Sequence, residues 1–502
     1  MDLSIRPRIR AAQACESCRA RKQKCGEERP QCRQCNDAKL ECIYRDVAPG
    51  KSDRTLLHIL GRLSRIESLL EKPKDTVMGR VVETEIPSTQ DVSLPYRHKT
   101  AAHKLLLWPS IQGLFGDYIP DLLKDNAMSI EASRPMPPPS SQPPILLQAE
   151  AALEAYFKHF YIMHPFLDED YLRLSVENIL ANRLREDQES ALVLFVLALG
   201  CFPLNYDPLP FFSNAQRIFS VVSQITIEAV QCHLLAGLFY AQLVRPLDSW
   251  REINLASTTV SVLLSIPLNP SRQNLVHRAF WSTLILESDM LAELDLYPSG
   301  IARYEDYVPF PFRDEDSVAE SVRFHFLAQI AIRRLLNRMH AALYMDDFSP
   351  QVARELDFQL LQWRDALPPE LQWDDTEEPA MDINNARLRA KYYGARYIIM
   401  RPFVYEALLG NVQEAKDVQC CLESAMSSCR AFIHFQKPFL TNLYGTAEAQ
   451  WGNLLVILAA KQGGLGDYTN VLYDTRHFLG IVAEKNPSLA RDVKLLDSIH
   501  II

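Results

Sequence analysis

The pattern of hydrophobic and polar residues separates a short polar head from a long helical body. From about residue 148 onward, apolar residues recur every three or four positions, which is the period of an amphipathic helix. Leu153, Tyr156, Phe157 and Phe160 form one such face. Because few segments alternate as strands do, the pattern predicts an all-α domain over residues 148–502.

The same periodicity gives approximate bounds for the helices of this body. They are expected at Ser190–Cys201, Ala215–Val244, Trp250–Leu264, Asn274–Leu294, Ser317–Tyr344, Gln351–Leu367, Ile383–Leu409, Val412–Phe435 and Thr446–Lys461. The longest uncharged apolar run, Ala191 to Phe202, is too short to span a bilayer, so no membrane partner is expected. The N-terminus has no hydrophobic signal region, which argues against secretion.

A separate helical pattern runs from Asp53 to Lys72, within a segment of linker and helix assigned to residues 46–72. Its apolar residues recur at alternating spacings of three and four, as in the core positions of a coiled coil: Leu56, Ile59, Leu63, Ile66 and Leu70. This stripe predicts a short parallel coiled coil and therefore a homodimer. The alternative is a single amphipathic helix that packs on the body, and Gly61 weakens the helix.

Residues 73–147 are expected to be a partly disordered, proline-rich spacer. The cluster between Pro135 and Pro144 is incompatible with a helix or a central strand. The run from Leu105 to Phe115 is too apolar for a free linker, so it is expected to dock on the body as a short amphipathic piece.

Charge is distributed unevenly between head and body. The chain of 502 residues has ordinary globular composition, with 48% hydrophobic and 23% charged residues and a net charge of −9. Residues 1–54 nevertheless hold 13 Lys and Arg against 8 Asp and Glu. A basic head on an acidic body predicts that any contact with nucleic acid is confined to the head.

The basic head contains two copies of the spacing C-x2-C-x6-C, offset by seventeen residues. The six cysteines are Cys15, Cys18, Cys25, Cys32, Cys35 and Cys42. Zinc prefers soft sulfur ligands in a closed tetrahedral shell. Two zinc ions need eight ligand positions, and six sulfurs fill them only if two bridge. The spacing therefore predicts two Zn(II) in a module, residues 1–45, that is too small to fold without metal.

The run from Ala14 to Cys25 (ACESCRARKQKC), with Pro30–Cys35 and Glu41–Tyr44, resembles the DNA-binding domain of fungal binuclear zinc-cluster transcription factors. The resemblance implies that Cys15 and Cys32 bridge the two ions. It also implies that the helix after Cys18 enters the major groove, where Arg21 and Lys22 contact a CGG-type triplet.

The basic side chains support this reading on electrostatic grounds. Two zinc ions and six thiolates carry a net charge of −2, which by itself would repel DNA. Arg19, Arg21, Lys22 and Lys24, expected on one short helix, supply the compensating charge. Arg19 and Lys24 are assigned to phosphate contacts, which position a module without reading sequence. The alternative is a zinc-stapled protein-interaction module with a solvated basic face.

The body is similar to the fungal-specific regulatory domain, or middle homology region, that accompanies the zinc cluster. The matching pieces include Ala155–Phe157, His164–Phe166, Arg278–Trp281, Tyr307–Pro311 and Arg401–Phe403. Arg278-Ala279 stands where that family has paired arginines. The resemblance implies regulation by transcriptional coregulators or by a small-molecule effector.

No catalytic constellation is visible, so the chain is not expected to be an enzyme: G-x-S-x-G, H-E-x-x-H and glycine-rich nucleotide loops are absent from the sequence. A small-molecule sensor would use aromatics such as Trp281 and Tyr297 near a helical pocket, but core packing explains these rings more simply. Arg387, Arg389 and Lys391 are interpreted as a solvated helix face.

Together these features predict a multidomain, mostly α-helical protein of the nucleus that binds double-stranded DNA. It would activate a set of metabolic genes, for example those of a secondary-metabolite biosynthesis pathway. The alternatives are a repressor or an effector-responsive metabolite sensor with the same architecture.

Overall fold

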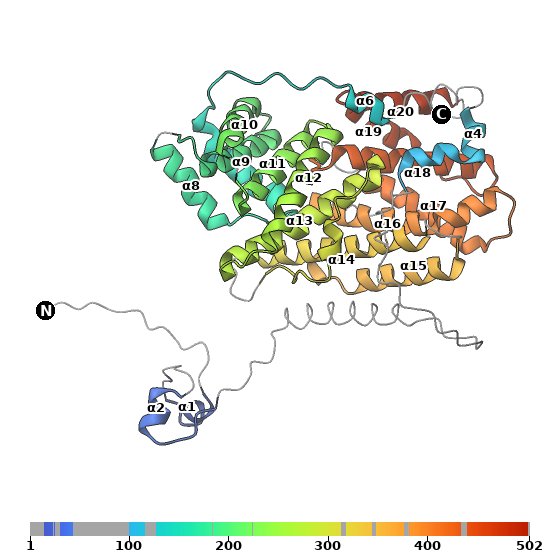
Figure 1. Cartoon of the computed structure of the whole chain (residues 1–502). Helices are drawn as coiled ribbons and strands as arrows, with labels where there is room; N and C mark the ends of the chain where they lie inside the picture. Colours follow the sequence, from blue (N-terminus) through green and yellow to red (C-terminus); the bar gives the residue numbers. More distant parts are fainter. Residues whose placement is uncertain are drawn as a thin grey trace, which may run out of the picture. The chain divides into compact units, whose positions relative to one another are not determined.

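A computed structural model describes residues 15–23, 25, 31–43, 100–115, 127–182, 184–222, 224–312, 318–343, 348–375, 380, 382–432 and 439–499. The chain divides into two compact units, residues 1–78 and residues 79–502 (Figure 1). In the described part of both units, every regular element is helical, as the sequence predicts. None of the described helices is both long and apolar enough to cross a membrane.

The first unit contains two five-residue helices, α1 (Glu16–Ala20) and α2 (Arg33–Asp37). The second unit begins with short elements that precede the main helices. They are η1 (Ala102–Leu107), α4 (Pro109–Phe115), α6 (Ala127–Ala132), η3 (Leu146–Gln148), α7 (Ala149–Tyr156) and the π-helical turn η4 (Phe157–Tyr161).

The helices of the body then follow one another through short connections. They are α8 (Glu169–Ala181), α9 (Gln188–Leu204), α10 (Leu209–Val222), α11 (Ile227–Gln242), α12 (Pro246–Leu263), α13 (Pro270–Leu294), η5 (Ile301–Tyr304), α14 (Glu320–Leu343), α15 (Pro350–Asp365), η6 (Pro369–Leu371), α16 (Ile383–Leu408), α17 (Ala415–Arg430), α18 (Leu443–Gln462), η7 (Thr469–Val471), α19 (Leu472–Ala483) and α20 (Pro487–Ser498). Helices α8 to α12 occupy one side of the body and α15 to α19 the other, with α13 between them (Figure 1).

Short polar side chains fix where several helices begin. Asp187 accepts a hydrogen bond from the backbone N–H of Ser190 at 2.8 Å and so caps α9. Thr226 caps α11 in the same way, through the N–H of Ala229 at 3.2 Å. The helix expected over Ala215–Val244 is therefore two helices, because Thr226 ends the continuous pattern with a new N-cap.

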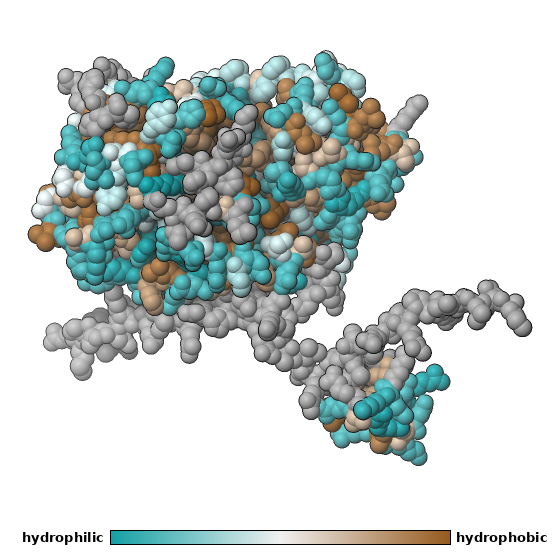
Figure 2. All heavy atoms as spheres, turned by 180° about the vertical axis from the view of Figure 1, so that it is seen from behind, coloured by the Kyte–Doolittle hydropathy of each residue, from teal (hydrophilic) through white to brown (hydrophobic). Residues whose placement is uncertain are grey.

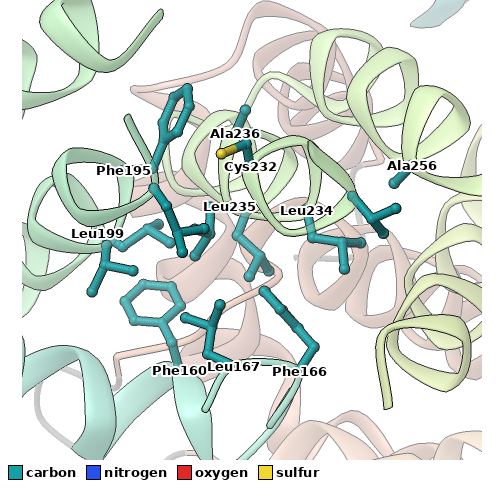
Figure 3. Packing of buried hydrophobic residues seen from close by; sticks show 14 of the residues in the cluster. Phe160, Phe166, Leu167, Phe195, Leu199, Cys232, Leu234, Leu235, Ala236 and Ala256 are labelled. Atoms are coloured by element: carbon teal, nitrogen blue, oxygen red, sulfur yellow. The ribbon is translucent and has the colours of Figure 1, made fainter. Parts of the chain in front are cut away.

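The N-terminal half of the body packs around α9 and α11, which are apolar on nearly all sides. Phe160, Phe166 and Leu167 project toward the α11 side chains Leu234 and Leu235 (Figure 3). All of these side chains are buried. A helix that is hydrophobic all round belongs in the centre of a core, and the packing of α7, α10 and α12 around this pair is consistent with that rule.

Two positions show how closely the core elements approach. A Cβ atom on Gly200 would lie 1.8 Å from the carbonyl oxygen of Ala152, so only glycine permits the contact between α7 and α9. Arg278 on α13 is buried and donates hydrogen bonds to the carbonyl oxygens of Pro165 and Leu167, both at 2.5 Å. Arg278 thus joins α13 to the loop that follows η4.

The described parts of the predicted spacer contact the body. Leu105, Leu106, Ile111 and Phe115 are buried, and both η1 and α4 contact α18. The run expected to dock does so as two elements. In the proline-rich stretch, Arg245 donates to the carbonyl oxygen of Pro135 at 2.9 Å.

Candidate metal centre and nucleic-acid interface

The cysteine side chains lie together in space, as the repeated spacing predicts. The sulfurs of Cys15, Cys18, Cys32 and Cys35 all lie within 4.8 Å of one another, and all four residues are buried. Cys25 is buried in the same cluster, and half-buried Cys42 packs against it. The sulfur of Cys42 accepts a hydrogen bond from the backbone N–H of Cys32 at 3.3 Å.

The distances between these sulfurs fit a zinc shell. Ligands 2.3 Å from a tetrahedral zinc ion lie about 3.8 Å from one another. The observed sulfur separations are 3.8 Å for Cys15–Cys32 and 3.5 Å for Cys15–Cys35. Cys18 lies 3.6 Å from Cys32 and 3.9 Å from Cys35. Cys25 and Cys42 are the further thiols that a second ion requires.

The close thiols perturb one another. Burial raises the pKa of the Cys32 thiol, but hydrogen bonds from the Cys35 backbone and from neighbouring thiols outweigh burial and lower this pKa to about 6. Burial and hydrogen bonds with Cys15 and Cys32 raise the pKa of Cys18 to about 12. The thiols of this cluster therefore resist joint ionisation on their own, and a bound divalent cation such as zinc would compensate the charge of the thiolates.

The seventeen-residue repeat extends from the sequence to the backbone. The Gln23 N–H donates to the Cys18 carbonyl at 3.0 Å, and the Leu40 N–H donates to the Cys35 carbonyl at 2.9 Å. Between them, Lys22 and Lys39 adopt left-handed conformations with φ of 48° and 52°. Each half therefore ends its helix in the same Schellman turn.

This turn corrects the expected placement of the basic residues. Helix α1 ends at Ala20, so Arg21 and Lys22 lie in the turn after the helix rather than on it. The reason is the left-handed residue, which reverses the chain and brings Cys25 back to the cluster. Both Arg21 and Lys22 are exposed, and the visible described surface of this unit is largely hydrophilic (Figure 2).

Several predicted site residues lie outside the described part of the chain. They are Lys24, the side chain of Arg19, and the coiled-coil stripe Leu56, Ile59, Leu63, Ile66 and Leu70.

Within the body, the residues singled out by the sequence separate. Trp281 is buried and stacks on Phe310 with ring centroids 5.3 Å apart, whereas Tyr297 is 53% exposed. Trp281 is thus a core residue. Arg387 and Lys391 do not form a solvated face; both are only partly exposed and line a cavity together with Arg333. Sequence reasoning missed this cavity because its residues come from several helices.

Comparison with known proteins agrees with the geometry of the small unit. Residues 13–51 match the fungal Zn(2)-Cys(6) binuclear cluster domain. Over 86% of this chain and 83% of its own length, transcription factor ecdB of Aspergillus rugulosus is 22% identical. Multidrug resistance regulator 2 of Candida albicans is 23% identical over 55% of this chain and 52% of its own.

A shorter match covers the head. Transcription regulator galc of Aspergillus niger is 38% identical over 92 residues, which are 18% of this chain and 11% of that protein. No solved structure matches the chain. The small unit is a binuclear cluster that takes two zinc ions, and the chain is similar over most of its length to a fungal transcription factor.

Proposed function

We propose that this protein binds DNA sequence-specifically at CGG-type triplets in promoters and regulates transcription by RNA polymerase II. In this proposal the zinc ligands are Cys15, Cys18, Cys25, Cys32, Cys35 and Cys42, with Cys15 and Cys32 bridging. The short sulfur separations and the burial of five of the six cysteines support this assignment. Zinc supplies folding energy to the unit, and the protein side chains do the recognition.

The observation that carries the proposal is an asymmetry between two halves with the same backbone turn. The first half bears Arg19, Arg21, Lys22 and Lys24. Seventeen residues later, the second half bears Asn36, Ala38, Lys39 and Glu41. The frame repeats, but of the four basic residues only Lys22 has a basic counterpart, Lys39, so Arg19, Arg21 and Lys24 are not needed for the turn itself.

We assign base contacts to Arg21 and Lys22 and phosphate contacts to Arg19 and Lys24. Arg and Lys side chains suit the O6 and N7 acceptors of guanine in the major groove. The position of Arg21 and Lys22 after the end of α1, exposed beside the cluster, leaves both side chains accessible to DNA.

The helix at residues 53–72 would join two copies through Leu56, Ile59, Leu63, Ile66 and Leu70. The protein would act in the nucleus, without enzymatic activity, as an activator of a metabolic gene set such as a secondary-metabolite pathway, through coregulators that contact the helical body. A repressor of the same architecture is the alternative.

The proposal is tested by fluorescence anisotropy with the full-length protein and a labelled duplex that contains two CGG triplets. At fixed salt, the zinc-loaded protein should bind this duplex at least tenfold more tightly than a duplex with scrambled triplets. A chelator should abolish the difference. Equal affinity for both duplexes would reject sequence-specific recognition of CGG.

A further inference from the structure

A partly open cavity of about 240 Å³ lies between helices of the body. Its wall is formed by α13, α14, α16 and α18, with Ser428 of α17 and the segments around His164 and Leu440. Each water molecule occupies about 30 Å³ in the liquid, so the volume equals that of about eight waters. This is slightly below the usual range of pockets for drug-sized ligands, so a smaller molecule would fit.

Cationic groups outnumber anionic ones in the wall. Arg333, Arg387 and Lys391 face the cavity together with two carboxylates, Asp289 and Glu293. Asp289 is paired with Arg333, and its carboxylate also lies 3.4 Å from the Lys391 ammonium. Asp289 is therefore the ion-pair partner of two of the three cations, Arg333 and Lys391.

The second acid adds little negative charge at neutral pH. Burial raises the pKa of Glu293 to about 8, and the hydrogen bond from the Asn442 amide at 2.9 Å only partly opposes this. At pH 7 Glu293 is thus mostly protonated, and the cavity carries an excess of positive charge.

Four polar atoms of the wall have no hydrogen-bonding partner among the described residues. They are Nδ1 of His164, Nε of Arg333, Nε of Arg387 and Oε1 of Gln450. His164, Arg333 and Gln450 are only 4%, 4% and 3% exposed. Buried polar atoms are nearly always hydrogen-bonded, so four unsatisfied atoms on one cavity indicate that something other than protein binds there.

The cations themselves show the same deficit of negative charge. Burial lowers the pKa of Arg333 to about 9. Burial and the neighbouring charge of Arg333 lower the pKa of Lys391 well below its ordinary value, although Glu293 opposes this shift. A bound anion would stabilise both charges.

The wall also contains hydrophobic side chains. Leu286, Leu336, Leu388, Ile398 and Phe432 line the cavity together with the charged and polar groups. We propose that this cavity binds a small organic carboxylate, with its acid group at Arg333 and Lys391 and its apolar part among these five side chains. A ligand there would touch four helices of the regulatory body at once.

Such a ligand would act as an effector of the transcription factor, and this role rests on the proposed function. Binding itself does not. The ligand would contact α13, α14, α16 and α18 together only when these helices are packed in the folded protein. Binding would therefore stabilise the folded state by mass action.

The test is thermal unfolding of the full-length protein with octanoate and benzoate, and with octanamide and benzamide as uncharged matches. We expect at least one carboxylate to raise the melting temperature by a saturable 2–4 °C or so, and neither amide to do so. The shift should persist after zinc is chelated, so failure of the DNA-binding proposal leaves this result intact. No shift with either carboxylate, or equal shifts with carboxylate and amide, would overturn the proposal.

Variants of Gly394 on α16 separate binding from folding. The nearest atom to a Cβ built at this position is Ser428 Oγ, at 3.9 Å, so the wall has room there. Gly394→Met should fold and abolish the shift by filling the cavity, whereas Gly394→Ala should keep the shift. Lys391→Met should weaken carboxylate binding about tenfold or more. Wild-type affinity in Gly394→Met or Lys391→Met, or an equal shift with sulfate, would contradict the site.

Discussion

Replacing Lys22 by glycine should weaken DNA binding while the zinc unit stays folded. Lys22 has φ of 48°, a left-handed conformation that L-residues adopt at a cost and that glycine adopts freely. Lys39 has φ of 52° at the equivalent place in the second half and is also exposed. Lys39→Gly is therefore a control matched in charge, backbone and exposure.

The expected magnitudes follow from this geometry. Glycine relieves roughly 1–2 kcal/mol of left-handed strain, and the greater freedom of the unfolded chain offsets about 0.4–1 kcal/mol of that gain. Both variants should thus be as stable as the wild type or slightly more so. A lost base contact costs about 1–3 kcal/mol of binding free energy, or roughly 5- to 150-fold in affinity, and only Lys22→Gly should incur it.

The assay is anisotropy titration of a CGG-containing duplex at two salt concentrations, with zinc content measured by mass spectrometry for each protein. Both variants should retain two zinc ions, and Lys39→Gly should bind DNA as the wild type does. Equal losses in the two variants would mean that the turn, or non-specific charge, matters rather than the Lys22 side chain. Unchanged affinity in Lys22→Gly would move the base contact elsewhere.

Three further predictions concern the cluster and the body. Cys25→Ala should unfold the small unit and abolish DNA binding, since a binuclear cluster needs all six sulfurs; two retained zinc ions by mass spectrometry would contradict this. Gly200→Ala should destabilise the body by about 1–3 kcal/mol, because the new methyl group would meet a backbone oxygen at 1.8 Å. Gly394→Ala should be neutral or stabilising by about 0.5–1 kcal/mol. Calorimetry measures both stabilities, and a Gly200→Ala variant as stable as Gly394→Ala would contradict the prediction. The pKa of Glu293 is raised to about 8, so the folded protein holds a proton that the unfolded chain releases above its ordinary pKa of 4.5, and stability falls as pH rises between these values. Glu293→Gln should therefore lose less melting temperature than the wild type between pH 5 and pH 8, and parallel curves would refute the assignment.

The zinc unit was largely predictable because its chemistry is local. Cysteine spacing alone identified the sulfurs that converge, since ligands of one metal cluster must lie close in a chain of about thirty residues. The left-handed turn was not predicted, because lysine rather than glycine occupies it at both Lys22 and Lys39. The seventeen-residue repeat did carry the signal, since it places the two lysines at the same position in each half.

The body was predictable in its helices but not in its cavity. Apolar periodicity located α9 and α13 to within a few residues, whereas the break between α10 and α11 depends on one capping side chain, Thr226. Charged residues with the spacing of Arg387 and Lys391 usually face solvent on a helix. Only the packing of α16 against α14 and α18 turns them toward Arg333, and tertiary contacts of that kind leave no local pattern.

The most direct test of the central claim is selection of random duplex DNA by the zinc-loaded full-length protein at a defined salt concentration. We expect enrichment of CGG-type triplets, as a pair at one fixed spacing if the helix predicted at residues 53–72 dimerises. Enrichment should disappear with Lys22→Gly and survive in Lys39→Gly. Absence of any enriched sequence, or the same enrichment in zinc-stripped protein, would contradict recognition of DNA by the zinc cluster.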